Sequence, residues 1–237
     1  MLNICYTTAY MMAKKIWSPI LKEENKRTFY RNIKLEIDEM YVSSGSKGKI
    51  NLDRQPRKRG LKANKGRGNF EKDKPAIVTF VNRNTKETMF FVPEHLSGNM
   101  IVNKLQNHIS EGSEPIIYTD EYRMYSKLES AGYRHEIVDH SIEYVKNKDI
   151  HINNCENRHS LLRIFLQIRR GVSKYNVQSY VDFFQFFFNI RLQTRNPLEI
   201  VSQVINAIVI FFTLFTTLQN LQFFENFNMN FEYIALL

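Results

Sequence analysis

The sequence predicts an α/β fold built on a mixed sheet, because three strand-like runs come first and two more strands then alternate with three helices. The chain has 237 residues, of which 43% are hydrophobic. This length and composition fit one domain of ordinary size with a buried core, together with terminal extensions. No internal repeat is visible.

The first three strands follow from two patterns. Residues 34–42 alternate, so that one face carries Leu35, Ile37, Glu39 and Tyr41 and the other carries Glu36, Asp38 and Met40. The β-branched and aromatic runs 76–81 and 88–92 flank a polar segment and therefore predict a hairpin with its turn at 82–87.

The remaining elements are marked by caps and breakers. Ser97 is a suitable N-cap for a helix reaching about residue 108, and Gly112 and Pro115 separate that helix from a strand at 116–120. A helix at 121–131, a strand at 133–140 and a helix at 153–170 follow. Gly132 and Gly171 end the two helices.

Positive charge is concentrated in one stretch. Between Lys47 and Lys74 there are eleven basic and three acidic residues, a local net charge of plus eight, whereas the whole chain has plus nine. We expect a basic loop inserted after the first strand that contacts nucleic-acid phosphates. A solvated linker and a nuclear-import signal are alternative interpretations. The candidate DNA contacts are Arg57, Lys58, Arg59, Lys62, Lys65 and Arg67.

Cys5 and Cys155 are the two cysteines, and no Cys-x-x-Cys pair is present. This usage indicates a reducing compartment and argues against a zinc site. The N-terminus lacks a secretory signal pattern. We therefore expect the nucleus if the host is a eukaryote, and otherwise the cytoplasm.

The C-terminal part, residues 192–237, is an extension of unknown role. Residues 200–224 carry no charge and are long enough to cross a bilayer, but Ser, Thr, Asn and Gln interrupt them. We expect no stable membrane partner. A packed helix, or sequence outside the working protein, is favoured over a membrane anchor.

Three acids stand at positions typical of a two-metal site: Asp38 inside the first strand, Asp120 at the end of a later strand, and Glu156 at the start of a helix. Carboxylates are preferred ligands of Mg²⁺ and Mn²⁺, and two such ions support phosphoryl transfer. The sequence therefore indicates metal-dependent chemistry on a nucleic-acid backbone.

Each acid also has an ordinary structural explanation. Asp120 is a suitable cap for the helix that follows it, and Asn153 with Glu156 fits a capping box. Asp38 is one of three acids in a strand and fits a solvent-facing position. Their order and their distribution over strands and helix favour the metal site.

Two neighbours extend the candidate site. Arg163 follows Glu156 by seven residues, about two helical turns, so both project from one helix face roughly 10 Å apart. There it is placed to hold a phosphate. Asn153 lies one turn before Glu156 and is placed to orient it.

Four blocks resemble the DDE transposase domain of the Merlin superfamily and its ISXO2-like bacterial insertion-sequence relatives. They are Ile37–Val42, Tyr118–Tyr125, Gly132–Ser141 and His151–Arg163, and the resemblance spans about residues 34–191. It implies a ribonuclease-H-like mixed sheet flanked by helices, and a transposase that uses two Mg²⁺ or Mn²⁺ ions to cleave and transfer DNA strands. Asp38, Asp120 and Glu156 are the implied metal ligands, with Asn153 and Arg163 beside them. Transposon ends and target DNA are the implied partners, with homo-oligomers forming on DNA.

The chain departs from the family in three places. Arg163 stands where Lys is usual, and His159 stands where Trp is frequent, which we expect to loosen helix packing. Residues 1–33 form only a basic lead-in where relatives carry a zinc ribbon and a helix-turn-helix, which we interpret as a remnant of an upstream DNA-binding region. A truncated or inactive copy, and a non-catalytic transposon-derived DNA-binding protein, are the alternatives.

Overall fold

The computed structural model describes residues 5, 7–12, 14, 15, 17, 26–30, 33–46, 67–138, 151–169 and 171–206. The chain divides into two compact units, Glu24–Leu192 and a second one made of Met1–Glu23 with Gln193–Leu237. The first unit contains the sheet and every described candidate site residue. The roles assigned to residues 1–33, 34–191 and 192–237 stay predictions.

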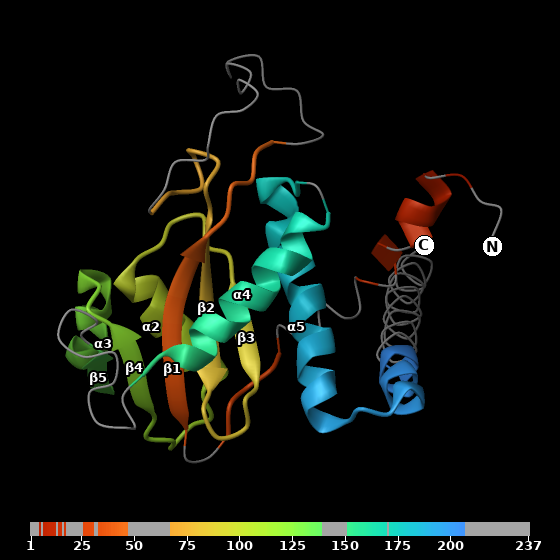
Figure 1. Cartoon of the computed structure of the whole chain (residues 1–237). Coiled ribbons are helices and arrows are strands. Elements are labelled where there is room, and N and C mark those ends of the chain that lie inside the picture. The colour runs from red at the N-terminus through yellow and green to blue at the C-terminus, as the bar shows by residue number, and fades with distance from the viewer. Residues whose placement is uncertain are drawn as a thin grey trace, which may run out of the picture. The chain divides into compact units, whose positions relative to one another are not determined.

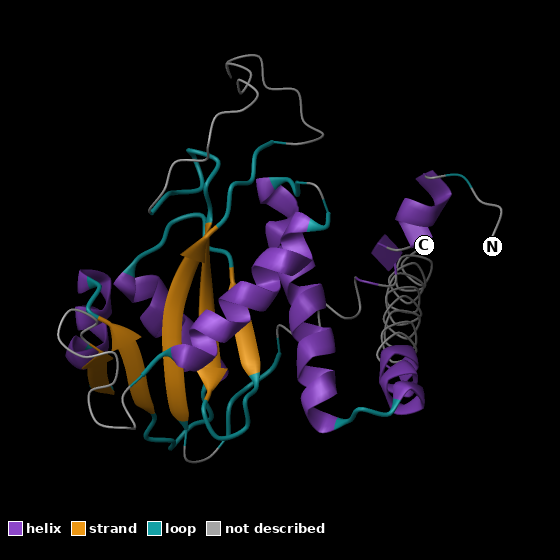
Figure 2. Cartoon of the chain, in the orientation of Figure 1, coloured by secondary structure: helices purple, strands orange, loops and turns teal. Residues whose placement is uncertain are grey.

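A five-stranded mixed sheet forms the centre of the first unit (Figure 2). Its strands are β1 (Lys34–Tyr41), β2 (Ala76–Asn82), β3 (Thr88–Phe91), β4 (Ile116–Asp120) and β5 (Arg134–Val138), in the spatial order β3-β2-β1-β4-β5. The first three strands pair antiparallel, and β4 and β5 run parallel to β1. The predicted ribonuclease-H-like mixed sheet flanked by helices is confirmed.

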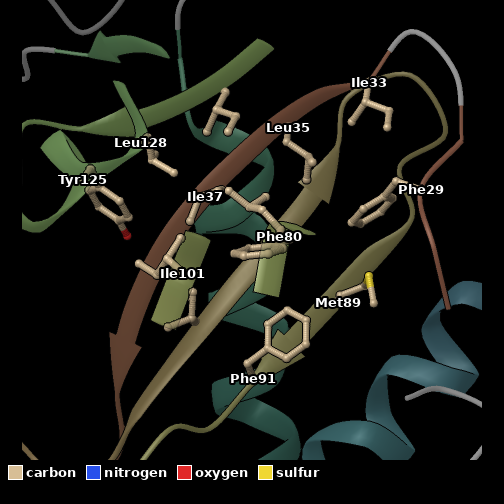
Figure 3. Close-up of a cluster of buried hydrophobic side chains, with 13 residues drawn as sticks. Phe29, Ile33, Leu35, Ile37, Phe80, Met89, Phe91, Ile101, Tyr125 and Leu128 are labelled. Atoms are coloured by element: carbon tan, nitrogen blue, oxygen red, sulfur yellow. The ribbon is translucent and has the colours of Figure 1, made fainter. Parts of the chain in front are cut away.

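One face of the sheet is covered by α2 (Gly98–His108) and α3 (Ser126–Ser130). Side chains alternate along β1, so Leu35 and Ile37 point to this face of the sheet. There they pack with Phe80 of β2 and Ile101 of α2 in the main apolar cluster (Figure 3). The predicted N-cap of α2 is confirmed, since the Ser97 side chain accepts a hydrogen bond from the backbone N–H of Met100 at 3.3 Å.

The opposite face is covered by α4 (Asn153–Gln167) and α5 (Val177–Gln193) (Figure 1). Met40 of β1 and Ile77 of β2 pack there against Leu162 of α4 and Val181 of α5. The second face of β1 also carries Glu36 and Asp38, so these acids lie beneath helix α4 rather than in water.

Side-chain amides of α5 satisfy the backbone of the edge strand β3. Asn189 accepts from the N–H of Thr88 and donates to its carbonyl, both at 2.9 Å, and Gln185 accepts from the N–H of Phe90 at 2.7 Å. Gln178 accepts from the N–H of Val92 at 2.6 Å. These amides take the place of a neighbouring strand and close an edge open to pairing with another chain.

The structure differs from the predicted elements around residue 121 and before residue 34. The predicted helix at 121–131 is a 3₁₀ turn, η1 (Arg123–Tyr125), followed by the short α3, because the Asp120 side chain accepts from the N–H of Tyr122 at 3.0 Å and holds a turn there. Residues before 34 also contribute to the core: Phe29 and Ile33 are buried, and Phe29 bridges to Ile109.

Most of the predicted basic loop and most of the uncharged C-terminal run lie outside the described residues. In the parts of the chain that the structure does describe, no helix is long and apolar enough to cross a membrane.

Candidate metal-dependent active site

The fold brings the elements that carry the three predicted acids together. Strands β1 and β4 are parallel neighbours in which Glu36 pairs with Tyr118, so two residues further on Asp38 and Asp120 reach the same level of the sheet. Glu156 lies in the first turn of α4, which packs over β1 and β2. Three segments far apart in sequence therefore contribute carboxylates to one region.

Asp38 has a strongly perturbed carboxyl. Burial, and then the negative charges of Glu39, Asp120 and Glu156, raise the pKa of its carboxyl to about 8. The side chain is 16% exposed, and one oxygen accepts a hydrogen bond from the N–H of Glu39 at 2.8 Å. Asp38 is thus a buried acid whose charged form a nearby positive charge would stabilise.

The donor chemistry fits Mg²⁺ or Mn²⁺, because carboxylate oxygens are the ligands that these ions prefer. A cation among Asp38, Asp120 and Glu156 would offset the repulsion that raises the Asp38 pKa. As the described side chains lie, no three His, Cys, Asp or Glu residues are grouped to hold a metal ion.

His159 is a site residue that the sequence interpretation assigned only to helix packing. One ring nitrogen, Nδ1, lies 3.5 Å from the Asp38 carboxylate, and the other, Nε2, is hydrogen-bonded to the Thr79 hydroxyl at 2.8 Å. Burial, and then the charge of Arg163, lower the pKa of His159 to about 4, so the ring is neutral at pH 7. This imidazole is buried and hydrogen-bonded between helix α4 and the sheet, and the expected loosening of packing relative to Trp stays a prediction.

Arg67 contacts acids rather than standing free for phosphates. Its guanidinium lies 3.4 Å from a Glu39 oxygen and 3.9 Å from an Asp120 oxygen. Glu39 also accepts a hydrogen bond from the Tyr125 hydroxyl at 2.7 Å, and burial raises its pKa. The end of the basic stretch thus provides a cation at the acidic site, which the charge pattern alone did not indicate.

Glu36 organises the start of α4 from beneath. This fully buried carboxylate accepts from the Asn154 N–H at 2.8 Å, the Asn154 amide at 2.6 Å and the Cys155 N–H at 3.2 Å. The Arg83 guanidinium donates to it at 2.8 Å and stacks on the Tyr118 ring. The alternative capping box is wrong, because α4 begins at Asn153 itself and a carboxylate from β1 caps it.

The remaining predicted site residues occupy one exposed part of α4. Glu156, Asn153 and Arg163 are all exposed, as expected for side chains one and two turns apart on one face. The other predicted DNA contacts, Arg57, Lys58, Arg59, Lys62 and Lys65, lie outside the described residues.

Comparison with solved structures found low similarity to retroviral assemblies. One is a chain of a simian T-cell lymphotropic virus intasome in complex with PP2A regulatory subunit B56 gamma (10% identity, TM-score 0.40), covering 66% of this chain and 49% of that one. Another is the HTLV-2 integrase catalytic core domain in complex with magnesium, in a trimeric form (9% identity, TM-score 0.36), covering 65% of this chain and 85% of that one. The fold assignment rests on the strand order and pairing.

Sequence comparisons are more specific. An uncharacterized protein in transposable element ISH50 of Halobacterium salinarum is 35% identical over 152 residues, which are 64% of this chain and 50% of that relative. The chain thus spans half the length of this curated relative. The model of the ISXO2-like transposase domain matches residues 34–189, the segment that supplies all five strands and the three acids. By this match, the chain belongs to the ISXO2-like transposase domain family.

Proposed function

We propose that this chain is the catalytic part of a DNA transposase that cleaves and transfers DNA strands with two divalent ions, Mg²⁺ or Mn²⁺. The observation that carries the proposal is the buried Asp38 carboxyl with its raised pKa, surrounded by the charges of Glu39, Asp120 and Glu156. Placing a buried acid among other carboxylates costs stability and is typical of sites that bind cations.

Asp38, Asp120 and Glu156 would hold the ions. When bound, the ions would activate an attacking water or DNA 3′-hydroxyl and stabilise the charge that develops on the phosphate as the new P–O bond forms and the old one breaks. The hydrogen bond from the Glu39 N–H, with the neutral His159 ring packed 3.5 Å away, would hold the Asp38 carboxylate in place and limit reorganisation at the site.

The exposed face of α4 would contact the DNA substrate. Asn153, one turn from Glu156, would orient its carboxylate, and the planar guanidinium of Arg163 would bind a phosphate. We propose transposon ends and target DNA as partners, with homo-oligomers forming on that DNA.

The direct test is cleavage by the purified chain. Supercoiled DNA carrying the element's ends is expected to be nicked with Mg²⁺ or Mn²⁺ and to stay intact with a chelator. DNA binding without metal-dependent nicking would contradict the proposal. It would support instead the alternative, a non-catalytic transposon-derived DNA-binding protein or an inactive copy.

A separate prediction concerns the basic stretch. Neutralising Arg57, Lys58, Arg59, Lys62 and Lys65 together by Gln is expected to weaken DNA binding on every sequence and to flatten its salt dependence. Each lost phosphate contact lowers the log–log slope by about 0.9. Equilibrium binding measured from low to moderate salt checks the slope, with Lys127→Gln on the exposed side of α3 as a single-charge control. An unchanged slope would identify the stretch as a linker.

A further inference from the structure

A pocket of about 240 Å³ opens beside the acidic site. Its lining residues include the aromatic Tyr41, Phe70 and Tyr122, the cationic Arg67, and the exposed Glu94 and His95. These groups come from β1, from the C-terminal end of the basic stretch, and from the loops after β3 and β4.

The pocket shares two residues with the acidic site. The backbone N–H of Tyr122 donates to one Asp120 oxygen at 3.0 Å, and the Arg67 guanidinium lies 3.9 Å from the other. The same guanidinium lies 3.3 Å above the Tyr122 ring. A ligand in the pocket would therefore sit next to the carboxylate of Asp120, and hence next to the DNA strand that the proposed function places there.

The walls fit a flat aromatic ligand better than a phosphate. Among the described lining residues, Arg67 carries the guanidinium that could bind a phosphate. Two carboxylates, Glu39 and Asp120, already offset its charge. The Tyr122 ring and Arg67 form a stacked pair that a third planar group can extend, and Phe70 and Tyr41 add further π surface. Nucleobases stack on such rings and guanidinium planes without regard to sequence.

The volume agrees with this ligand. Pockets for drug-sized molecules enclose about 300–1,000 Å³. The pocket is smaller than that range, which suits a single base rather than a base pair. A base can enter only when it is unpaired, because pairing and stacking in a duplex hide its faces.

We propose that this pocket binds one unpaired nucleobase of the DNA strand whose backbone lies at the acidic site, by stacking on the Arg67–Tyr122 pair. The inference rests on the proposed function for the identity of the strand. It adds a site that holds DNA in register beside the carboxylates independently of metal ions.

Binding measured in a chelator tests the pocket without any reaction. Duplex DNA with a short single-stranded overhang is expected to bind the wild-type chain more tightly than blunt duplex of equal length. Tyr122→Leu, which removes the ring and keeps an apolar side chain, is expected to lose about 5- to 100-fold affinity for the overhang DNA. Tyr122→Phe keeps the ring and should stay within about twofold. Blunt duplex should bind all three proteins equally.

Phe70→Leu provides an independent variant on another wall, with the same expected pattern. In the wild-type chain, 5-iodouracil placed along the overhang is expected to photo-crosslink to Tyr41, Phe70 or Tyr122 from one overhang position. Crosslinks elsewhere only, or equal losses on overhang and blunt DNA, would overturn the proposal.

Free dAMP distinguishes the source of the base. Millimolar dAMP is expected to leave overhang binding unchanged, because a free nucleotide lacks the backbone contacts that present the base. Competition at micromolar dAMP would assign the pocket to a free nucleotide and overturn the proposal. A chain that stacks the overhang but never cleaves DNA would contradict the proposed function alone, and a chain that cleaves without overhang preference would contradict the pocket alone.

Discussion

Asp38→Asn is expected to abolish metal-dependent DNA cleavage while making the protein more stable in a chelator. Losing one of the proposed metal-binding carboxylates should lower cleavage by at least about a thousandfold. At pH 7 the same change should raise the free energy of unfolding by about 2–4 kcal/mol, because one pKa unit corresponds to about 1.4 kcal/mol.

The sign of the stability effect follows from the raised pKa of Asp38. Its ordinary value is 3.8, and in the folded protein it is about 8, so between these values the folded state holds a proton that the unfolded state has released. Wild-type stability therefore falls as pH rises from about 4 to 8 and levels off above that. Asn keeps the shape and does not titrate, so the stability gap should widen over this pH range.

Chemical denaturation between pH 4 and 9 measures this gap. Glu121→Gln, at an exposed position beside Asp120, also removes one negative charge and should change stability by less than about 0.5 kcal/mol. Added Mg²⁺ should stabilise the wild type and leave Asp38→Asn unchanged. If the difference in unfolding free energy between the two proteins stays constant with pH, the pKa of Asp38 is not raised in the folded state.

Further variants distinguish the proposed metal-binding carboxylates from a residue that only orients them. Asp120→Asn and Glu156→Gln should lose cleavage as fully as Asp38→Asn. Asn153→Ala should lose only about 10- to 100-fold, as is usual for a residue that orients a ligand. Full cleavage by either carboxylate variant would remove that residue from the metal site.

Glu36→Ala is expected to cost about 3–5 kcal/mol of folding stability, the largest loss from any single substitution considered. It leaves the Arg83 guanidinium, 10% exposed, without its carboxylate, and it strips the acceptor from two N–H groups at the start of α4. Glu36→Gln keeps one acceptor oxygen and the side-chain shape, so its cost should be about 1–3 kcal/mol.

Denaturation and amide hydrogen exchange measure the two parts of this prediction. In Glu36→Gln, exchange at Asn154, Cys155 and Glu156 should rise more than exchange in α2, since the lost cap belongs to α4 alone. Glu111→Ala, in an exposed turn, is the control and should lie within about 0.5 kcal/mol of wild type. If Glu36→Ala were as mild as this control, Glu36 would have no role in anchoring α4.

The sequence by itself determined the order of strands and helices, because alternation in β1 and helical spacing in α2 are local patterns that burial on one face imposes. It also indicated Asp38, Asp120 and Glu156 as one site, since their element types and order restrict where they meet. The family resemblance supplied the sheet arrangement that these patterns leave open.

Only the tertiary structure decided which charges meet. Glu36 and Asp38 share one face of β1, yet Glu36 is neutralised by Arg83 and the start of α4, whereas Asp38 faces other carboxylates and a neutral His159. Arg67 belongs by composition to the basic stretch predicted to contact phosphates, but it lies against Glu39. Such pairings depend on distances of a few ångströms between segments far apart in sequence. Coulomb energy and desolvation change steeply over those distances, and periodicity and composition carry no information about them.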